Sequence, residues 1–253
     1  YFRLIDVMAR MALRADASRF FFFFIWWVLE PLLWVGVFYV VFTMIMVSRT
    51  PDFLVFLMTG KLVFVWFSKS VTQASNSIVT SKGLVGKINV PKTLFPMAAI
   101  QEGMYRQIAV FVLLLVFLLG NGYTVTSTWW YLAPVILVTY VIIVACAFVG
   151  ACLVCLARDF IQLISLGMLF LMFTSGIFWD VRSLGDHHKT DMVMALNPLA
   201  FIVDCYRQIM MHNTPPDMLH LLTIGAGFGA LLCAMVLIMR HSSQYLALRA
   251  ITA

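Results

Sequence analysis

Charged residues are scarce in this chain. Of its 253 residues, 17 are Lys or Arg and 11 are Asp or Glu, so 11% of the sequence is charged while 63% is hydrophobic. The mean hydropathy is +0.98. A soluble core of this length cannot enclose so many apolar side chains. The composition therefore indicates an integral membrane protein.

The sequence also lacks a complete nucleotide-binding loop. The segment GLVGK (Gly83 to Lys87) looks like part of one, but a Walker loop needs four residues between its glycines and a Ser or Thr after the lysine. Here two residues separate Gly83 from Gly86, and Ile88 follows Lys87. We predict that the chain binds no cofactor itself, and that energy comes from a partner chain or an ion gradient.

Catalytic and metal-binding patterns are missing as well. No general acid, base or nucleophile constellation emerges, so we predict that the chain is not an enzyme. Three cysteines on one apolar run are interpreted as small buried residues; they are Cys146, Cys152 and Cys155. His187 and His188 lie near two aspartates, Asp186 and Asp191, but adjacent histidines point apart and no spaced ligand set supports a metal site.

Apolar residues occur in long runs instead of alternating with polar ones, which argues against a β-barrel. A helix that crosses a hydrocarbon layer of about 30 Å needs roughly 20 apolar residues. Six runs approach or exceed this length: Trp26 to Val47, Phe53 to Val71, Met97 to Leu119, Tyr131 to Leu156, Phe160 to Phe178 and Met218 to Met239. We expect an all-α integral membrane fold, one domain over residues 1–253, with both termini on one side.

Lys and Arg are concentrated on one side of this topology, as expected for cytoplasmic segments. With a cytoplasmic N-terminus, the inner segments hold Arg3, Arg10, Arg14, Arg19, Lys82, Lys87, Lys92, Arg158, Arg240 and Arg249. The outer segments hold only Arg49, Arg182, Lys189 and Arg207. The net charge of +6 therefore reflects topology and attraction to anionic lipid, and it does not indicate a nucleic-acid partner.

Residues 1–20 are too polar to span a membrane but are patterned as an amphipathic helix. Arg3, Arg10 and Arg14 gather on one side, with Arg19 near the end, while apolar residues occupy the opposite side. We expect a helix in the inner interface. The alternative is a simple positively charged topology anchor.

The loop from Ser81 to Pro96 joins the second and third runs on the inner side. Its first residues favour a short helix capped by Ser81, and Pro91 and Pro96 flank the entry to the third run. Such a helix is typical of a docking element. The alternative is an ordinary basic loop that sets orientation.

Four segments resemble, in their order, those of ABC-2 type permeases. They are WWVLEPLLWVGVFYVVF (26–42), GLVGKINVPKTLFPMAAI (83–100), ARDFIQLI (157–164) and LNPLAFIVDCYRQIMM (196–211). The chain looks most like permeases that export O-antigen or capsular polysaccharide, the Wzm/KpsM kind.

The resemblance implies a homodimer with six spans in the bacterial inner membrane, driven by two copies of a separate ATPase subunit that uses ATP and Mg. It also implies a coupling helix set against that ATPase, at Leu84, Val85, Gly86, Lys87, Ile88 and Asn89. The cargo would be lipid-linked polysaccharide.

The last outer segment, Trp179 to Asp217, contains a second short helix. Asn197 is a good cap and Pro198 suits the first turn, but the helix is too short and polar to span, so it should lie at the outer surface or dip back beside protein. The resemblance suggests that such helices close the outer mouth. We expect the gate to involve Trp179, Asn197, Pro198, Tyr206 and Arg207; the last two either contact sugar or phosphate or are purely structural.

Aromatic residues make up 15% of the chain. Sugar rings pack well against aromatic faces, but membrane interfaces also attract Trp and Tyr. The candidate transport path comprises Trp34, Tyr39, Lys61, Phe64, Trp66 and Phe67. Lys61 is notable because it lies well inside the second run. Glu102 and Arg106 have the i,i+4 spacing of an ion pair.

The function indicated is that of a channel-forming permease subunit for polysaccharide. Alternatives are an ABC-2 permease for a teichoic-acid-like polymer, lipid or drug, or an ion-coupled secondary transporter. The latter normally has internal repeats and buried acids at midspan, which are not found. A membrane enzyme acting on lipid-linked sugar is disfavoured by the lack of paired catalytic groups.

Overall fold

The computed structural model describes residues 1–19, 29–30, 32–34, 36–37, 40–41, 52–85, 91–185, 187–242, 245 and 249. Within these residues every regular element is a helix, which confirms the all-α prediction for this part of the chain. The elements are α1 (Phe2–Arg19), α3 (Phe53–Thr80), α4 (Lys82–Val85), α5 (Leu94–Gly120), η2 (Ser127–Tyr131), α6 (Leu132–Leu156), α7 (Phe160–Thr174), η3 (Val181–Leu184), α8 (His187–Leu196), α9 (Pro198–Met210) and α10 (Met218–His241).

Four helical segments are long and apolar enough to cross a membrane: Phe53–Thr80, Leu94–Gly120, Ser127–Leu156 and Met218–His241. The run from Trp26 to Val47 lies mostly outside the described residues. α7 has 15 residues, about 22 Å at 1.5 Å per residue, which is shorter than the hydrocarbon layer. It ends at Thr174, before the predicted Phe178, because Gly176 turns the chain with a positive φ of 67°.

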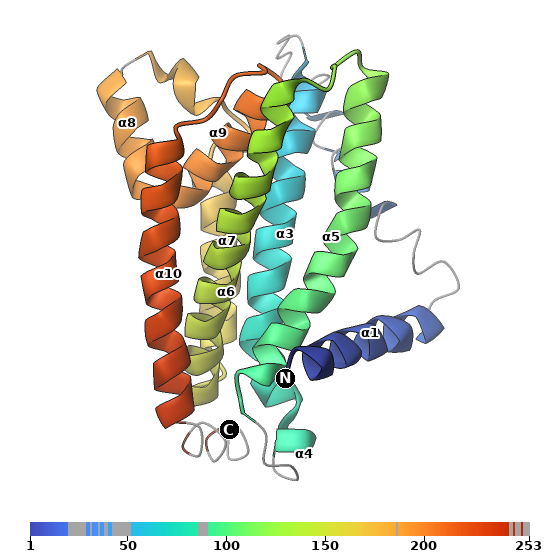
Figure 1. The fold of residues 1–253 in the computed structure, drawn as a ribbon, viewed down its shortest axis with the longest axis vertical. Helices are drawn as coiled ribbons and strands as arrows, with labels where there is room; N and C mark the ends of the chain where they lie inside the picture. The colour runs from blue at the N-terminus through green and yellow to red at the C-terminus, as the bar shows by residue number, and fades with distance from the viewer. Residues whose placement is uncertain are drawn as a thin grey trace.

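The long helices stand side by side, and α3 is the one most enclosed by the others (Figure 1). It packs against α5, α6, α7 and α9, and its apolar side chains supply much of the core. α10 packs mainly against α6, and of its residues only Leu221 and Met239 are buried. The rest of its apolar surface is left for lipid or another chain.

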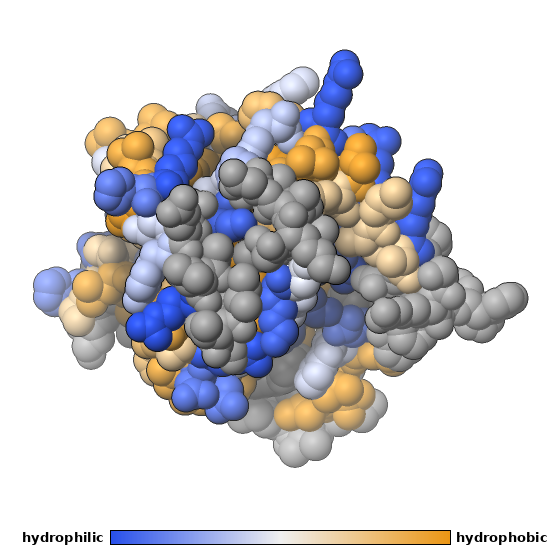
Figure 2. All heavy atoms as spheres, turned by 90° about the horizontal axis from the view of Figure 1, so that it is seen from below, coloured by the Kyte–Doolittle hydropathy of each residue, from blue (hydrophilic) through white to orange (hydrophobic). Residues whose placement is uncertain are grey.

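The two ends of the bundle differ. The lower end in Figure 1 carries α1, α4 and the last turn of α10, and the upper end carries α8, α9 and the turn after α5. α1 lies across the lower end against α5, where Ile5 and Ala9 are buried. Hydrophilic side chains are spread over the lower face, between hydrophobic patches (Figure 2).

α1 is a helix, and one residue of its polar side, Asp6, is bonded to the bundle. Asp6 accepts a hydrogen bond from the hydroxyl of Tyr105 on α5 and pairs with Arg10 at 3.1 Å. The hydrogen bond with Tyr105 is the main reason that the pKa of Asp6 is lowered. Arg3, Arg10 and Arg14 remain exposed, and Arg19 ends the helix.

Candidate functional site

Buried polar side chains occur in several parts of the bundle, including the region around α9 at the upper end and the region between α3 and α7. α9 begins as predicted: the Asn197 side chain accepts hydrogen bonds from the backbone N–H groups of Leu199 and Ala200, at 3.1 and 3.3 Å, and Pro198 fills the first turn. Residues 199–210 are all buried, packed against α3, α6 and α8. The short helix is therefore held beside protein and not on the outer surface.

Arg207 is the most constrained charged residue of α9. Its guanidinium donates to the carbonyl of Gly176 at 2.6 Å, to that of Ile177 at 3.0 Å and to that of Phe56 at 3.1 Å. The charge also lies over the Phe56 ring, 3.4 Å from its centroid. A buried guanidinium that remains charged needs acceptors such as these carbonyl oxygens around it. Arg207 thereby ties α9 to α3 and to the turn after α7.

Gly60 makes room for this guanidinium. A Cβ atom at residue 60 would lie 2.5 Å from Nη2 of Arg207 and 3.3 Å from a methyl group of Val203. Real Cβ atoms essentially never approach other atoms so closely. Gly60 therefore leaves the space that the Arg207 guanidinium occupies, and a side chain at this position would make the guanidinium move.

Two aromatic candidates of the transport path pack in the core between helices. Trp66 and Phe67 are buried in the core, where Trp66 meets Phe111 edge to face at 5.9 Å and Phe111 stacks on Tyr206 at 6.0 Å. Tyr206 is 0% exposed and its hydroxyl lies 3.4 Å from that of Thr139. In this conformation these rings pack helices together, and a contact with cargo stays a prediction.

The turn after α7 is fastened by two other candidate gate residues. The indole Nε1 of Trp179 donates to the carbonyl of Phe173 at 2.9 Å, and the Asn197 amide donates to the hydroxyl of Ser175 at 3.0 Å. Trp179 fastens this turn to α7, Asn197 ties it to the start of α9, and Arg207 ties it to the last turn of α9. Their action as a gate stays a prediction.

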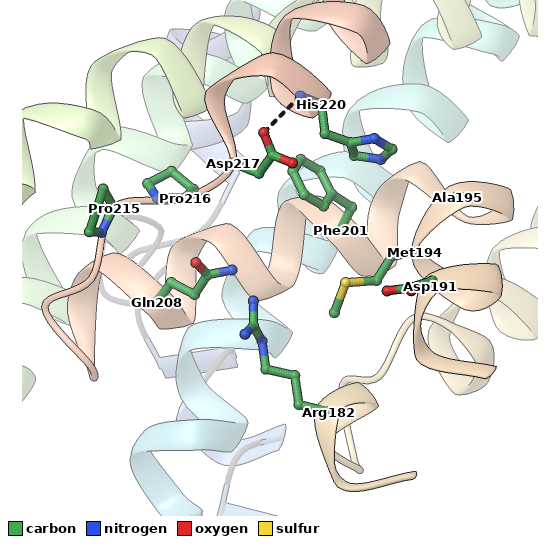
Figure 3. Close-up of a pocket in the computed structure, with 10 residues that line it drawn as sticks. All are labelled: Arg182, Asp191, Met194, Ala195, Phe201, Gln208, Pro215, Pro216, Asp217 and His220. Atoms are coloured by element: carbon green, nitrogen blue, oxygen red, sulfur yellow. Dashed lines mark hydrogen bonds between the residues drawn. The ribbon is translucent and has the colours of Figure 1, made fainter. Parts of the chain in front are cut away.

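A cavity of about 630 Å³ opens beside α9, lined by residues from η3, α8, α9 and the start of α10 (Figure 3). On one side, Arg182 donates hydrogen bonds of 3.0 and 2.8 Å to the Asp204 carboxylate, and Gln208 donates to the same carboxylate at 2.5 Å. This contact raises the pKa of Arg182. On the other side, His220 meets Phe201 edge to face at 4.3 Å. The bidentate pair fixes η3 to α9.

A smaller groove of about 250 Å³ lies between α3 and α7, and it includes Lys61 and Phe64 among its lining residues. Lys61 is only 6% exposed; its ammonium lies 3.0 Å from the sulfur of Met172 and 5.7 Å from the ring centroid of Trp34. Farther down α3, Lys69 pairs with Glu30 at 2.6 Å. The structure thus brings three of the path candidates, Trp34, Lys61 and Phe64, to one place. Tyr39 lies outside the described residues.

At the lower end, the predicted short helix is present as α4, which follows Ser81. Leu84 and Val85 are its last residues, while the other docking candidates, Gly86, Lys87, Ile88 and Asn89, lie outside the described residues. The predicted pair of Glu102 and Arg106 forms on α5, and Gln73 of α3 donates to Glu102 at 3.0 Å.

Sequence patterns did not point to Gly60, Asp204 or Met172. Each acts through a partner at least 22 positions away along the chain: Arg207, Arg182 and Lys61 respectively. Among the described residues no group of three or more His, Cys, Asp or Glu could hold a metal ion.

The chain is similar in sequence to known proteins over most of its length. The sequence pattern of the ABC-2 type transporter family matches residues 7–211. An O-antigen export system permease protein RfbA from Myxococcus xanthus is 26% identical over 228 residues, which cover 89% of this chain and 87% of that protein. A protein of the same name from Klebsiella pneumoniae is 24% identical over 214 residues, 84% of this chain and 82% of that protein.

Proposed function

The chain belongs to the ABC-2 type transporter family, and from that premise we propose that it is the channel-forming permease subunit of an ATP-driven polysaccharide exporter. The cargo is lipid-linked polysaccharide of the O-antigen or capsule type, moved from the cytoplasm across the inner membrane. The observation that carries this proposal is similarity over most of both chains to proteins named as O-antigen export permeases.

In this proposal the lower end of the bundle faces the cytoplasm, the chain has six spans, and both termini are cytoplasmic. Support comes from the basic residues that the described chain has near that end, since Lys and Arg are retained on the cytoplasmic side. They include Arg3, Arg10, Lys82, Arg158 and Arg240. At the upper end, Arg182 is paired with Asp204 and Arg207 is held by carbonyl groups.

Energy enters through a separate ABC ATPase, two copies of which act on a homodimer of this chain. The partner binds ATP and Mg, because this sequence contains no complete Walker loop. The coupling helix is the segment from Leu84 to Asn89. Its support is the position of α4 at the tip of the lower end, between α3 and α5 (Figure 1).

The upper end forms the outer gate. Asn197 and Arg207 hold the turn after α7 against α9, and Trp179 holds the same turn to α7, so a movement of α7 is transmitted to α9. Since Tyr206 and Arg207 are buried, their part in the gate is to position α9, and Pro198 and Asn197 fix where that helix begins. Interfaces packed in this way switch between discrete arrangements more readily than they deform continuously.

The test is export in vesicles that contain the chain together with its ATPase partner, with ATP supplied on the ATPase side. Replacing both Val85 and Lys87 with Asp should abolish export and weaken co-purification of the ATPase, because two carboxylates are placed in the docking segment. Val125→Asp is the matched control, as Val125 is 62% exposed and lies beyond α5 at the opposite end. Normal export by the double variant would contradict the docking segment, and export under an ion gradient without the ATPase would contradict the proposed function.

A further inference from the structure

The groove between α3 and α7 is built from two facing helical stripes. On α3 the stripe includes Lys61, Phe64, Ser68 and Lys69, and on α7 it includes Ser165 and Met172. Residues three, four, seven and eight positions apart share one face of a helix. The groove therefore runs along the axes of both helices, with polar groups set at intervals between apolar ones.

The polar groups of this groove are ammonium groups and hydroxyls. Lys61 and Lys69 carry ammonium groups, which only donate hydrogen bonds. Ser68 and Ser165 carry hydroxyls, each with one donor proton; that of Ser165 donates to the carbonyl of Ile161 at 2.9 Å. No acidic side chain is among the described residues that line it. The nearest described carboxylate, that of Glu30, reaches the groove from outside by pairing with Lys69. One ammonium group near each end of the groove, with two hydroxyls at the level of Lys69, suits an anion with several acceptor oxygens.

The groove also lies at membrane depth. Lys61 is eight residues from the upper end of α3 and Lys69 is eight residues further, so they lie about 12 and 24 Å along a helix of about 42 Å. Its volume of about 250 Å³ is below the ~300–1,000 Å³ of pockets that enclose a drug-sized ligand. A compact charged group fits it, with apolar chain on either side.

We propose that this groove binds the phosphate that joins the lipid to the polysaccharide, while the substrate is inside the membrane. The proposal rests on the proposed function and names the part of the cargo that this site recognises. The ammonium of Lys61 holds the phosphate oxygens in the upper part of the groove. The hydroxyls of Ser68 and Ser165, about 10 Å farther down, hold them in the lower part, where the Ser165 hydroxyl exchanges its bond to the carbonyl of Ile161 for one to phosphate. Lys69 joins them when it leaves Glu30, so the Glu30 carboxylate competes with the phosphate for the same ammonium.

The test measures binding of radiolabelled polyprenyl diphosphate to the full chain in nanodiscs of phosphatidylcholine. We expect Lys61→Met to weaken binding about tenfold or more, the equivalent of one lost charged hydrogen bond. Ser165→Ala should weaken it by a smaller factor, and since Ser165 is exposed on α7, that variant leaves the fold intact. Lys82→Met, which removes an exposed lysine of α4, is the matched control and should bind as the parent chain does.

Glu30→Gln should have the opposite effect and strengthen binding, because it removes the competing charge. A purely structural role of the Lys69–Glu30 pair predicts no gain. Weaker or unchanged binding by Glu30→Gln, or unchanged binding by both Lys61→Met and Ser165→Ala, would overturn the proposal.

Competing ligands identify the source of the phosphate. Neutral polyprenol, inorganic pyrophosphate and phosphatidylglycerol should each compete at least tenfold less well than the polyprenyl diphosphate. Equal competition by polyprenol would show that binding does not depend on the phosphate charge and would overturn the proposal. Equal competition by phosphatidylglycerol or pyrophosphate would overturn the assignment to lipid-linked substrate. Binding as expected in a chain that shows no ATP-dependent export would refute the proposed function and leave the phosphate site standing.

Discussion

Replacing Gly60 with alanine should loosen α9, although alanine is the better helix former by about 1 kcal/mol. The added Cβ would lie 2.5 Å from Nη2 of Arg207, so the guanidinium has to move. Nη2 then loses its bonds to the carbonyls of Phe56 and Ile177, which are 3.1 and 3.0 Å long. At about 1.5 kcal/mol for each bond with a charged group, the loss exceeds the helical gain and leaves a net cost of about 2 kcal/mol.

The assay compares the alkylation rates of two cysteines, one buried and one exposed. Cys205 lies on α9 and is 0% exposed, whereas Cys233 on α10 is exposed. When local opening is fast relative to the reaction, the alkylation rate of a buried thiol follows the free energy of opening. A cost of about 2 kcal/mol should raise the alkylation rate of Cys205 about 30-fold, with the rate at Cys233 unchanged.

The same substitution in a chain that lacks Arg207 tests whether the contact with Arg207 causes the faster alkylation of Cys205. In the Arg207→Met chain the clash is removed, so Gly60→Ala should change the Cys205 rate less than about threefold. Gly227→Ala is a matched control, because a Cβ at this glycine of α10 meets nothing within 4 Å. An equal rise in both backgrounds, or an equal rise at Cys233, would refute the reasoning.

Two further predictions concern the polar contacts at each end. The pKa of Asp6 is lowered mainly by its hydrogen bond from Tyr105, so this contact is intact above the ordinary pKa of 3.8 and is lost as the pH falls through the lower folded value. Hydrogen exchange in α1 should therefore rise in acid, and the rise should be absent in Asp6→Asn; the same rise in that variant would exclude this origin. Asp204→Asn should loosen η3 by about 1–2 kcal/mol, since Arg182 is more than half exposed, and faster exchange at residues 181–184 would be the measure, with unchanged exchange counting against it.

The local elements of this protein follow from its sequence because their causes are local. Long apolar runs predict α3, α5, α6 and α10, since a spanning helix satisfies its own backbone. Asn197 and Pro198 predict the start of α9, because capping depends on neighbouring residues. The order of four segments predicts the ABC-2 type transporter family, which the match over residues 7–211 shows. The sequence predicts an end for α7 at Phe178 instead of Thr174. The reason is that the run stays apolar past Gly176, whose left-handed backbone ends the helix.

What Arg207 and Lys61 do was decided only by the tertiary structure. On the sequence, Arg207 is one cation in a short helix and was equally compatible with binding cargo or with packing. Its acceptors come from α3 and from the turn after α7, far from it in the chain, and no local pattern records which carbonyls remain open to a donor. Lys61 likewise meets Trp34 and Met172 only because α7 packs on the same stripe of α3. Run length, capping and charge bias predict the helices and an orientation for them, while the partners of a buried charge depend on which distant segments the packing brings together.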